Sequence, residues 1–225
     1  MARKVKRRKL NVFRVFIVLV FLALIGLGIY YLSKMPVRGY YIIGNTYYSD
    51  YEILSKTKLD KYPSYLFTNS YSVTKNIKND KLIDSITIKH KVNGMFDVIV
   101  NENSILFYDE TKKKSILKDG NQIDYYYEYS PVLINDINDK KIYKKFIERF
   151  QKLDKELIKN ISEIKYDPND IDKERFLFSM NDGNYVYGTL SKISNINKYL
   201  EISSTLTDKK GILYLDYGNY FVPKE

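Results

Sequence analysis

Histidine and cysteine, the side chains most often used as catalytic bases, nucleophiles and metal ligands, are almost absent from this sequence of 225 residues. Cysteine does not occur, and His90 is the only histidine. Cys-His and Ser-His pairs and ordinary zinc sites therefore lack their main side chains. His90 stands at the end of an alternating apolar pattern, where we interpret it as a strand-end packing residue. The sequence predicts no catalytic residue, no metal site and no cofactor, and hence a protein that is not an enzyme.

The acidic residues lie mostly at predicted turns and helix starts, where carboxylates cap backbone N–H groups. The residues that fit this capping role are Asp136, Asp139, Asp167, Asp170 and Asp172. The segment Asp167–Asp172 has the alternating oxygen donors of a calcium loop. It lacks the glycine and the distal glutamate that such loops require, so we expect turn capping and not calcium binding.

Aromatic residues are more numerous than a core and its turns require, with 23 tyrosines and 11 phenylalanines. They crowd the end of the chain, and tyrosine favours protein interfaces because it buries area while keeping a polar tip. The predicted partner-binding residues are Ile212, Tyr214, Asp216, Tyr217, Asn219, Tyr220 and Phe221. The alternative is that these tyrosines are ordinary strand residues, which is the interpretation we favour for Tyr125–Tyr127.

The elements that would position these residues form two groups. In the first, the predicted order is strand, helix, helix, strand, strand. The expected ranges are a strand at 40–43, a helix opened by the Ser49-x-x-Glu52 capping box and ending near 59, a helix at 72–82, and strands at 85–92 and 96–100. Asn93-Gly94 predicts the hairpin between the last two strands, with Val92 facing inward.

The second group is mostly short strands, expected at 105–108, 115–117, 132–134, 161–166, 175–180, 185–188 and 211–216. One continuous helix is predicted over 140–159, because its apolar residues recur at steps of three and four. A last helix is predicted over 192–206, with Ile193, Ile196, Leu200 and Leu206 inward, and residues 217–225 are expected to form an aromatic tail. This group predicts a sheet flanked by two helices.

The stretch Val15–Leu32 holds eighteen residues without a charge or a proline, enough for a helix of about 27 Å, close to the thickness of a bilayer. Seven lysines and arginines and no acid occupy positions 1–14, which favours a cytoplasmic N-terminus. The prediction is a single-pass type II membrane protein. A cleaved signal peptide is the competing interpretation, but this apolar run is longer than a typical signal sequence has.

The formal charge of +10 comes mainly from that N-terminal tail, since the rest of the chain has 30 basic and 27 acidic side chains. A nucleic-acid-binding surface needs basic residues gathered on the folded part, so we expect no nucleic-acid partner. With no cysteine, the folded part must be held by its core alone.

The layout resembles the bacterial cell-division protein family FtsQ/DivIB along the whole chain. Ile42-Ile43-Gly44-Asn45 followed by Ser49, Glu52 and Ile53 looks like the family's opening strand, turn and capped helix, and Val98–Glu102 looks like its closing strand. The order of Asn160–Tyr166, Phe176–Phe178 with Asp182-Gly183, the Leu200 helix and Tyr214–Asp216 also resembles the family. The departures are Asn93 in place of a common hairpin proline and Asp216-Tyr217-Gly218 in place of Asp-x-Arg.

The resemblance implies an α+β protein: a cytoplasmic tail at 1–14, a transmembrane helix at 15–32, a POTRA domain at 36–103 and an extracytoplasmic β domain at 104–225. It also implies a non-enzymatic divisome scaffold at the septum. The implied partners are small bitopic division proteins of the FtsL and FtsB/DivIC types and, indirectly, the septal peptidoglycan synthesis machinery. We expect β-augmentation, in which the last strand, Ile212–Asp216 with Tyr217, Asn219, Tyr220 and Phe221, offers a sheet edge to a partner segment. The edge strands of the POTRA domain are a second candidate surface.

Two other classes of function stay open. One is a membrane-anchored assembly or secretion factor, unrelated to division, that uses its POTRA domain as a chaperone-like module. The other is a cell-wall enzyme, although the sequence shows no nucleophile paired with a base.

Overall fold

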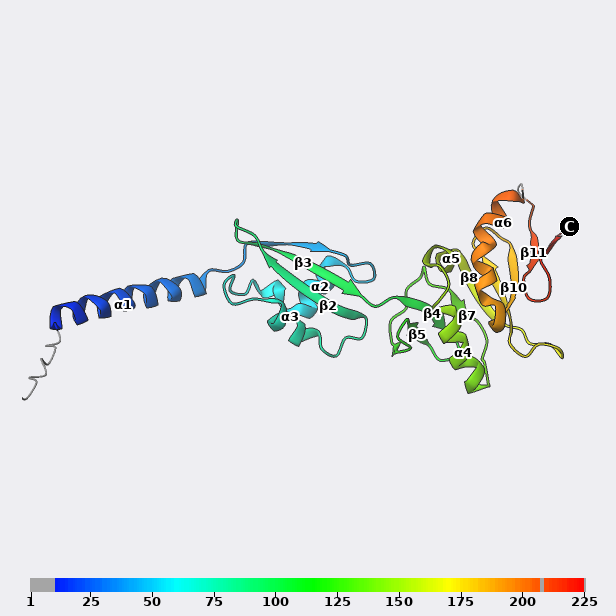
Figure 1. Ribbon diagram of the computed structural model, residues 1–225, viewed down its shortest axis with the longest axis horizontal. Helices are drawn as coiled ribbons and strands as arrows, with labels where there is room; N and C mark the ends of the chain where they lie inside the picture. The colour runs from blue at the N-terminus through cyan, green and yellow to red at the C-terminus, as the bar shows by residue number, and fades with distance from the viewer. Residues whose placement is uncertain (1–10, 207–208, 225) are drawn as a thin grey trace, which may run out of the picture. The chain divides into compact units, whose positions relative to one another are not determined.

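The computed structural model describes residues 11–206 and 209–224 of the chain (Figure 1). It divides into two compact units. Unit 1 consists of Met1–Asn79 with Ser85–Asn101, and unit 2 consists of Asp80–Asp84 with Glu102–Glu225. Each unit is described by itself below, and the prediction for positions 1–10 of the basic tail lies outside the described residues.

The helix α1 (Val12–Lys34) contains the predicted membrane span and extends it at both ends. Its 23 residues correspond to about 34 Å, and none of them is buried against the rest of the protein. It is long and apolar enough to cross a membrane. The aromatic residues Tyr30 and Tyr31 and the cation Lys34 gather at its C-terminal end, as is usual at a membrane surface.

Unit 1 contains the predicted order of two helices between strands. The elements are β1 (Gly39–Ile43), α2 (Asp50–Thr57), the 3-10 helix η1 (Leu59–Lys61), α3 (Ser70–Ile77), β2 (Ile83–His90) and β3 (Met95–Glu102). The sheet order is β1-β3-β2, with β1 parallel to the central strand β3. Alternate residues Phe96, Val98 and Val100 of β3 are buried, as the sequence pattern predicts. Figure 1 shows α2 and α3 lying against this sheet.

Both helices of unit 1 begin with a capping box. Ser49 and Glu52 satisfy each other's backbone N–H groups at the start of α2, which confirms the prediction, and the two hydrogen bonds from the Ser49 backbone and side chain lower the pKa of Glu52. Asn69 and Ser72 do the same at the start of α3. The start predicted at Ser72 was therefore wrong by two residues, because Ser72 is the third residue of the helix and not its cap.

The hairpin between β2 and β3 differs from the prediction. The backbone N–H of Lys91 donates to the Met95 carbonyl at 2.9 Å, and the N–H of Gly94 donates to the Lys91 carbonyl at 3.0 Å. Val92, Asn93 and Gly94 therefore form a three-residue turn, in which Gly94 takes the left-handed conformation with φ of 81°. Val92 lies at the tip, fully exposed, so its predicted inward position was wrong.

Unit 2 is built on a nine-stranded sheet, in the order β12-β11-β10-β9-β8-β7-β4-β5-β6. The strands are β4 (Ile105–Asp109), β5 (Lys114–Leu117), β6 (Gln122–Ile123), β7 (Val132–Leu133), β8 (Ile161–Tyr166), β9 (Arg175–Met180), β10 (Tyr185–Thr189), β11 (Gly211–Tyr214) and β12 (Tyr220–Pro223). The pairs β4–β7, β7–β8 and β10–β11 are parallel, and the other pairs are antiparallel. The predicted mixed sheet is confirmed.

The helix predicted as continuous over 140–159 is two helices, α4 (Lys140–Phe150) and α5 (Lys155–Lys159). The break lets Leu153 turn into the core, and the backbone N–H of Asp154 donates to the side chain of Asn197 at 3.1 Å. The spacing of the apolar residues could not predict this break, because Leu153 is buried whether the helix continues or turns at this point.

The helix predicted over 192–206 is the 3-10 helix η2 (Leu190–Lys198) followed by α6 (Tyr199–Thr205). Ile193, Ile196 and Tyr199 are buried, and their spacing of three matches the three residues per turn of a 3-10 helix. Leu200, which was predicted to face inward, is exposed because Tyr199 takes the inward position.

The core of unit 2 lies between one face of the sheet and these helices. Phe146 and Phe150 of α4 and Ile196 of η2 pack with Phe176 and Phe178 of β9 in this core. The rings of Phe146 and Phe176 stack with their centroids 4.6 Å apart. The opposite face of the sheet, which we call the open face, carries the alternate side chains of the same strands.

Candidate partner-binding surface

The last segment of the chain is a strand and not a tail. β12 (Tyr220–Pro223) pairs antiparallel with β11, so that Ile212 lies opposite Val222 and Tyr214 lies opposite Tyr220. β11 therefore has a neighbour on each side, β10 and β12. The prediction that Ile212–Asp216 forms the sheet edge was wrong, and the edge strand is β12. The sequence did not predict this strand, because four residues that end at a proline are too few to show an alternation of apolar and polar side chains.

A row of tyrosines crosses the open face at this end of the sheet. Tyr187 of β10, Tyr214 of β11 and Tyr220 of β12 occupy paired positions on adjacent strands. The ring centroids are 5.3 Å apart for Tyr187 and Tyr214, and 4.6 Å apart for Tyr214 and Tyr220. Both pairs are stacked, so the row presents a continuous aromatic strip that ends at the exposed ring of Tyr220.

The inner end of this row is fixed by Arg175 of β9. Its guanidinium lies 3.4 Å from the centre of the Tyr187 ring. Its Nε donates to Oδ2 of Asp216 at 2.8 Å, and Nη1 donates to Oδ2 of Asp167 at 3.1 Å. Tyr187 also donates its hydroxyl to Asp167 at 3.0 Å. One cation thus joins two carboxylates and a tyrosine from four segments of the sheet.

These contacts shift the pKa values of the groups involved. Burial lowers the pKa of Arg175, but the hydrogen bond to Asp216 and the neighbouring Tyr187 and Asp216 outweigh burial, so the pKa is raised. Burial raises the pKa of Asp167. Hydrogen bonds from Lys165 and Tyr187 and the charges of Lys165 and Arg175 lower this pKa by more than burial raises it, so the net shift is downward. Both shifts favour the charged forms of Arg175 and Asp167 at neutral pH.

The seven predicted partner-binding residues do not share one surface. Ile212, Tyr214 and Tyr220 lie on the open face, whereas Phe221 lies on the other face and packs against the core. Asp216 is buried with Arg175. Tyr217 and Asn219 are exposed in the loop that joins β11 to β12. The set therefore splits into an open-face group, a loop pair and two structural residues.

Arg175, Tyr185 and Tyr187 belong to the same face and were not predicted. Tyr185 lies opposite Ile212 in the register of β10 and β11, and Tyr187 lies opposite Tyr214. Alternation along β10, where Val186 is buried between two partly exposed tyrosines, is the signal that could have found them.

The other sequence candidates have structural roles. The His90 ring lies 5.0 Å from the Tyr65 ring and 4.7 Å from the Phe96 ring, which confirms the predicted packing role. Asp139 caps α4, and Asp172 accepts a hydrogen bond from the Glu174 backbone, as predicted. Within residues 11–206 and 209–224, no group of three or more His, Asp or Glu side chains could hold a metal ion.

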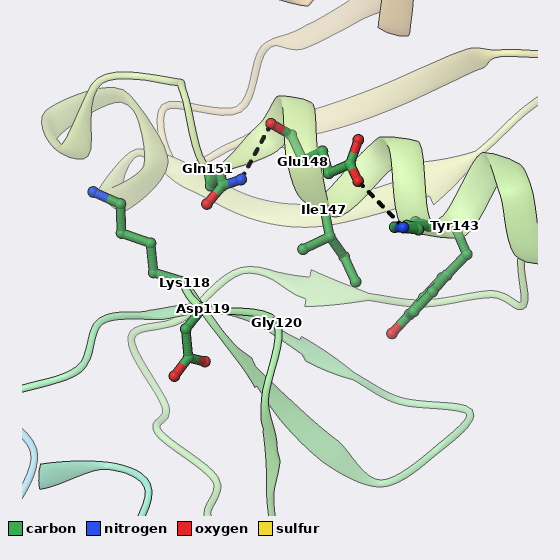
Figure 2. Close-up of a pocket in the computed structure, with 8 residues that line it drawn as sticks. Lys118, Asp119, Gly120, Tyr143, Ile147, Glu148 and Gln151 are labelled. Atoms are coloured by element: carbon green, nitrogen blue, oxygen red, sulfur yellow. Dashed lines mark hydrogen bonds and ion pairs between the residues drawn. The ribbon is translucent and has the colours of Figure 1, made fainter. Parts of the chain in front are cut away.

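A surface groove of ≈ 470 Å³ lies between α4 and the turn that follows β5. Figure 2 shows Tyr143 and Ile147 of α4 pointing toward the turn formed by Lys118, Asp119 and Gly120. The carboxylate of Asp119 accepts hydrogen bonds from Asn103 and Asn121, and Glu148 pairs with Lys144 at 3.9 Å. Both acidic residues that line the groove, Asp119 and Glu148, are thus engaged with neighbouring residues.

The chain is similar to bacterial cell division proteins named DivIB. No protein-family model matches the chain. The cell division protein DivIB of Oenococcus oeni is 29% identical over 166 residues, which are 66% of this chain and 58% of that protein. DivIB of Listeria monocytogenes is 24% identical over 97% of this chain and 84% of its own length. DivIB of Bacillus subtilis is 25% identical over 80% of this chain and 71% of its own length.

A solved structure, the major extracytoplasmic domain of the trans isomer of DivIB from Geobacillus stearothermophilus, superposes on 48% of this chain and 96% of its own with a TM-score of 0.40 and 21% identity. The similarity to DivIB of Listeria monocytogenes extends over nearly the whole chain, including most of the apolar helix α1. The similarity of the chain to these DivIB proteins supports its assignment to the FtsQ/DivIB family of cell-division proteins.

Proposed function

We propose that this protein is a non-enzymatic scaffold of the division machinery, anchored by α1 and binding small bitopic division proteins of the FtsL and FtsB/DivIC types. The family supports the division role. The free edge of β12, continuous with the tyrosine row of the open face, supports the binding role. The partners would connect the scaffold to septal peptidoglycan synthesis.

The edge of β12 has defined hydrogen-bonding groups. The backbone N–H of Lys224 donates to the Lys210 carbonyl at 2.8 Å, so residues 220, 222 and 224 direct their backbone groups toward β11. By alternation, Phe221 directs its N–H and C=O outward. Pro223 has no N–H, so the edge is short. A partner strand would pair with Phe221 and place side chains beside Tyr220.

The binding proposal is tested by removing residues 219–225 from the full chain and measuring co-purification with a partner of the FtsB/DivIC type. A deletion beginning at Ile212 would be unsuitable, because Leu213 and Leu215 are buried in the core. We expect loss of the partner while the near-UV circular dichroism of the tyrosines is retained. Undiminished co-purification by the folded, shortened chain would contradict the proposal.

Two point variants separate the edge from the face. Phe221→Pro removes the outward N–H together with the ring that packs against the core, and Tyr220→Ala removes the outermost ring of the row. We expect both to weaken binding. Tyr51→Ala is the matched control, because Tyr51 is an exposed tyrosine of α2 in unit 1. A loss of binding in this control equal to that of Tyr220→Ala would argue against the surface.

The location of the protein is tested with a fluorescent fusion in dividing cells. We propose a type II orientation, in which everything after α1 lies outside the cytoplasmic membrane, and enrichment at the division septum. Uniform staining of the membrane would favour an assembly or secretion factor instead. Release of soluble products from peptidoglycan by the purified protein would contradict the non-enzymatic assignment.

A further inference from the structure

Unit 1 exposes apolar side chains beside the segment by which it joins α1. Met35 follows the last residue of that helix directly and is 47% exposed. Leu66 is 47% exposed and Phe67 is 60% exposed, although both are large apolar residues of an ordered turn. Val92, at the tip of the β2–β3 hairpin, is fully exposed. We define Met35, Leu66, Phe67 and Val92 as the apolar rim.

The turn that carries Leu66 and Phe67 is held against residues 35–37. Pro36 and Ser64 form an antiparallel bridge. The backbone N–H of Val37 donates to the Pro63 carbonyl at 3.0 Å, and the N–H of Tyr65 donates to the Met35 carbonyl at 2.9 Å. The position of the turn is therefore set by the residues that leave α1.

The hairpin tip is held at the same place. The backbone N–H of Arg38 donates to the Gly94 carbonyl at 2.9 Å. The Tyr65 hydroxyl donates to the Lys91 carbonyl at 2.7 Å, while the Tyr65 ring stacks on Phe96 with centroids 5.3 Å apart. Tyr65 thus fixes both loops, and its anchored ring leaves the next two residues, Leu66 and Phe67, projecting outward.

Chain continuity brings this rim to the end of the membrane span. Val15–Leu32 covers about 27 Å of hydrocarbon, and Met35 is only three residues further on. The headgroup layer beyond the hydrocarbon is about 5–8 Å thick on each side. Leu66 and Phe67 follow Ser64, the residue bridged to Pro36, by two and three residues. Their Cα atoms therefore lie at most about 11 Å from that of Ser64. The rim is therefore close enough along the chain to reach this layer.

The composition of the rim suits a lipid surface. Phenylalanine, leucine, methionine and valine side chains gain free energy at the boundary between headgroups and acyl chains. The cations Lys34 and Arg38 flank Met35 in the sequence, are exposed, and would lie at the level of the lipid phosphates. We propose that the apolar rim inserts into the membrane surface at the C-terminal end of α1 and holds unit 1 against the bilayer.

The absence of tryptophan from the chain makes this contact directly measurable. The full-length protein is reconstituted into phosphatidylcholine vesicles as single-tryptophan variants Phe67→Trp and Val92→Trp. Brominated phosphatidylcholine quenches only indoles that contact lipid. We expect the emission of both variants to fall by about a factor of two when brominated lipid replaces ordinary lipid, as interfacial side chains should.

Tyr51→Trp is the matched control, because Tyr51 is exposed at the start of α2, which follows β1 as it runs away from residues 35–38. It should not be quenched. Equal, weak quenching of Phe67→Trp and Tyr51→Trp would overturn the proposal. Emission of Phe67→Trp that is blue-shifted but insensitive to brominated lipid would also overturn it, because a protein surface would then cover the rim.

A second pair of variants tests the contribution of the apolar side chains themselves. Replacing Leu66 by Asp in the Val92→Trp background should reduce quenching, because the turn and the hairpin tip are held together by Tyr65. Replacing Tyr71, an exposed residue of α3, by Asp in the same background is the control and should leave quenching unchanged. An unchanged signal with Leu66→Asp would contradict insertion of the turn. Neither experiment contains a division partner, so the result is independent of the proposed scaffold function.

Discussion

Arg175 and Asp216, 41 residues apart in the sequence, form a buried ion pair that ties β9 to the end of β11, with Nε and Oδ2 2.8 Å apart. Their side chains are only 12% and 5% exposed. Because a buried charge without a partner is costly, this pair controls where the β11–β12 loop leaves the sheet, and with it the position of the edge strand.

Arg175→Met should therefore lower the free energy of unfolding by about 3–5 kcal/mol, since Asp216 would be left buried without its cation. The measurement is urea unfolding of the full chain in detergent, followed by the near-UV signal of its 23 tyrosines. The double variant Arg175→Met with Asp216→Leu should be more stable than the single variant. Lys144→Met, which removes an exposed pair at 3.9 Å, is the control and should cost at most about 0.5 kcal/mol.

Gly211→Ala should detach β12 from β11. A Cβ at Gly211 would lie 2.2 Å from the Val222 carbonyl oxygen and 2.9 Å from Pro223 Cα, which are backbone atoms that cannot rotate away. We expect fast hydrogen exchange at Val222 and Lys224, and weaker binding of the proposed partner. Gly39→Ala is the control, because its Cβ would meet only the flexible end of Met95 at 3.1 Å. Unchanged exchange in Gly211→Ala would mean that the hairpin adjusts.

Acid should destabilise unit 2 through carboxylates whose pKa values are lowered in the folded state. Burial raises the pKa of Asp109, but hydrogen bonds from Lys112, Thr111 and Tyr143 lower this pKa by more than burial raises it. The pKa of Asp167 is also lowered, as described above. Their contribution is present above the unfolded value of about 3.9 and is lost as the pH falls through the folded values.

The free energy of unfolding should therefore change little between about pH 7 and pH 5 and decrease below about pH 4. Asp109→Asn should lower stability at pH 7 and flatten the acid dependence. A steep loss of stability between pH 7 and pH 5 would not come from these carboxylates and would contradict the assignment.

Ser49→Ala should destabilise unit 1 by about 1 kcal/mol, since it removes the hydroxyl that accepts the Glu52 backbone N–H at the start of α2. Ser55→Ala, on the exposed side of the same helix, is the control and should be close to neutral. Thermal unfolding of the two variants gives the comparison. An equal loss in both would assign the effect to the surface and not to the cap.

Most of the fold could be predicted from patterns among residues that are close in the sequence. The capping box at Ser49, the alternation of Phe96, Val98 and Val100, and the uncharged run of α1 each depend on neighbours within a few residues. Such signals are present in the sequence itself. They led to the correct order of elements in unit 1 and to the mixed sheet of unit 2.

Features decided by distant contacts were missed. Gln151–Asp154 breaks a helix that its apolar spacing favours, because Asn197 and the core select another path for the chain. Arg175 joins Asp167, Tyr187 and Asp216 only after the four strands β8 to β11 are aligned, so no local spacing could reveal it. The seven predicted binding residues formed one sequence cluster, yet strand alternation divided them between opposite faces.

Both edge strands of the large sheet are short, which limits the pairing of this sheet with strands of other molecules. β6, at one end, has only two residues, and β12, at the other, has four and stops at Pro223. Such short, interrupted edges do not extend a ladder from one molecule to the next. Under the proposed function, a single partner strand added to β12 would therefore complete the sheet at that edge, which predicts one partner strand for each sheet.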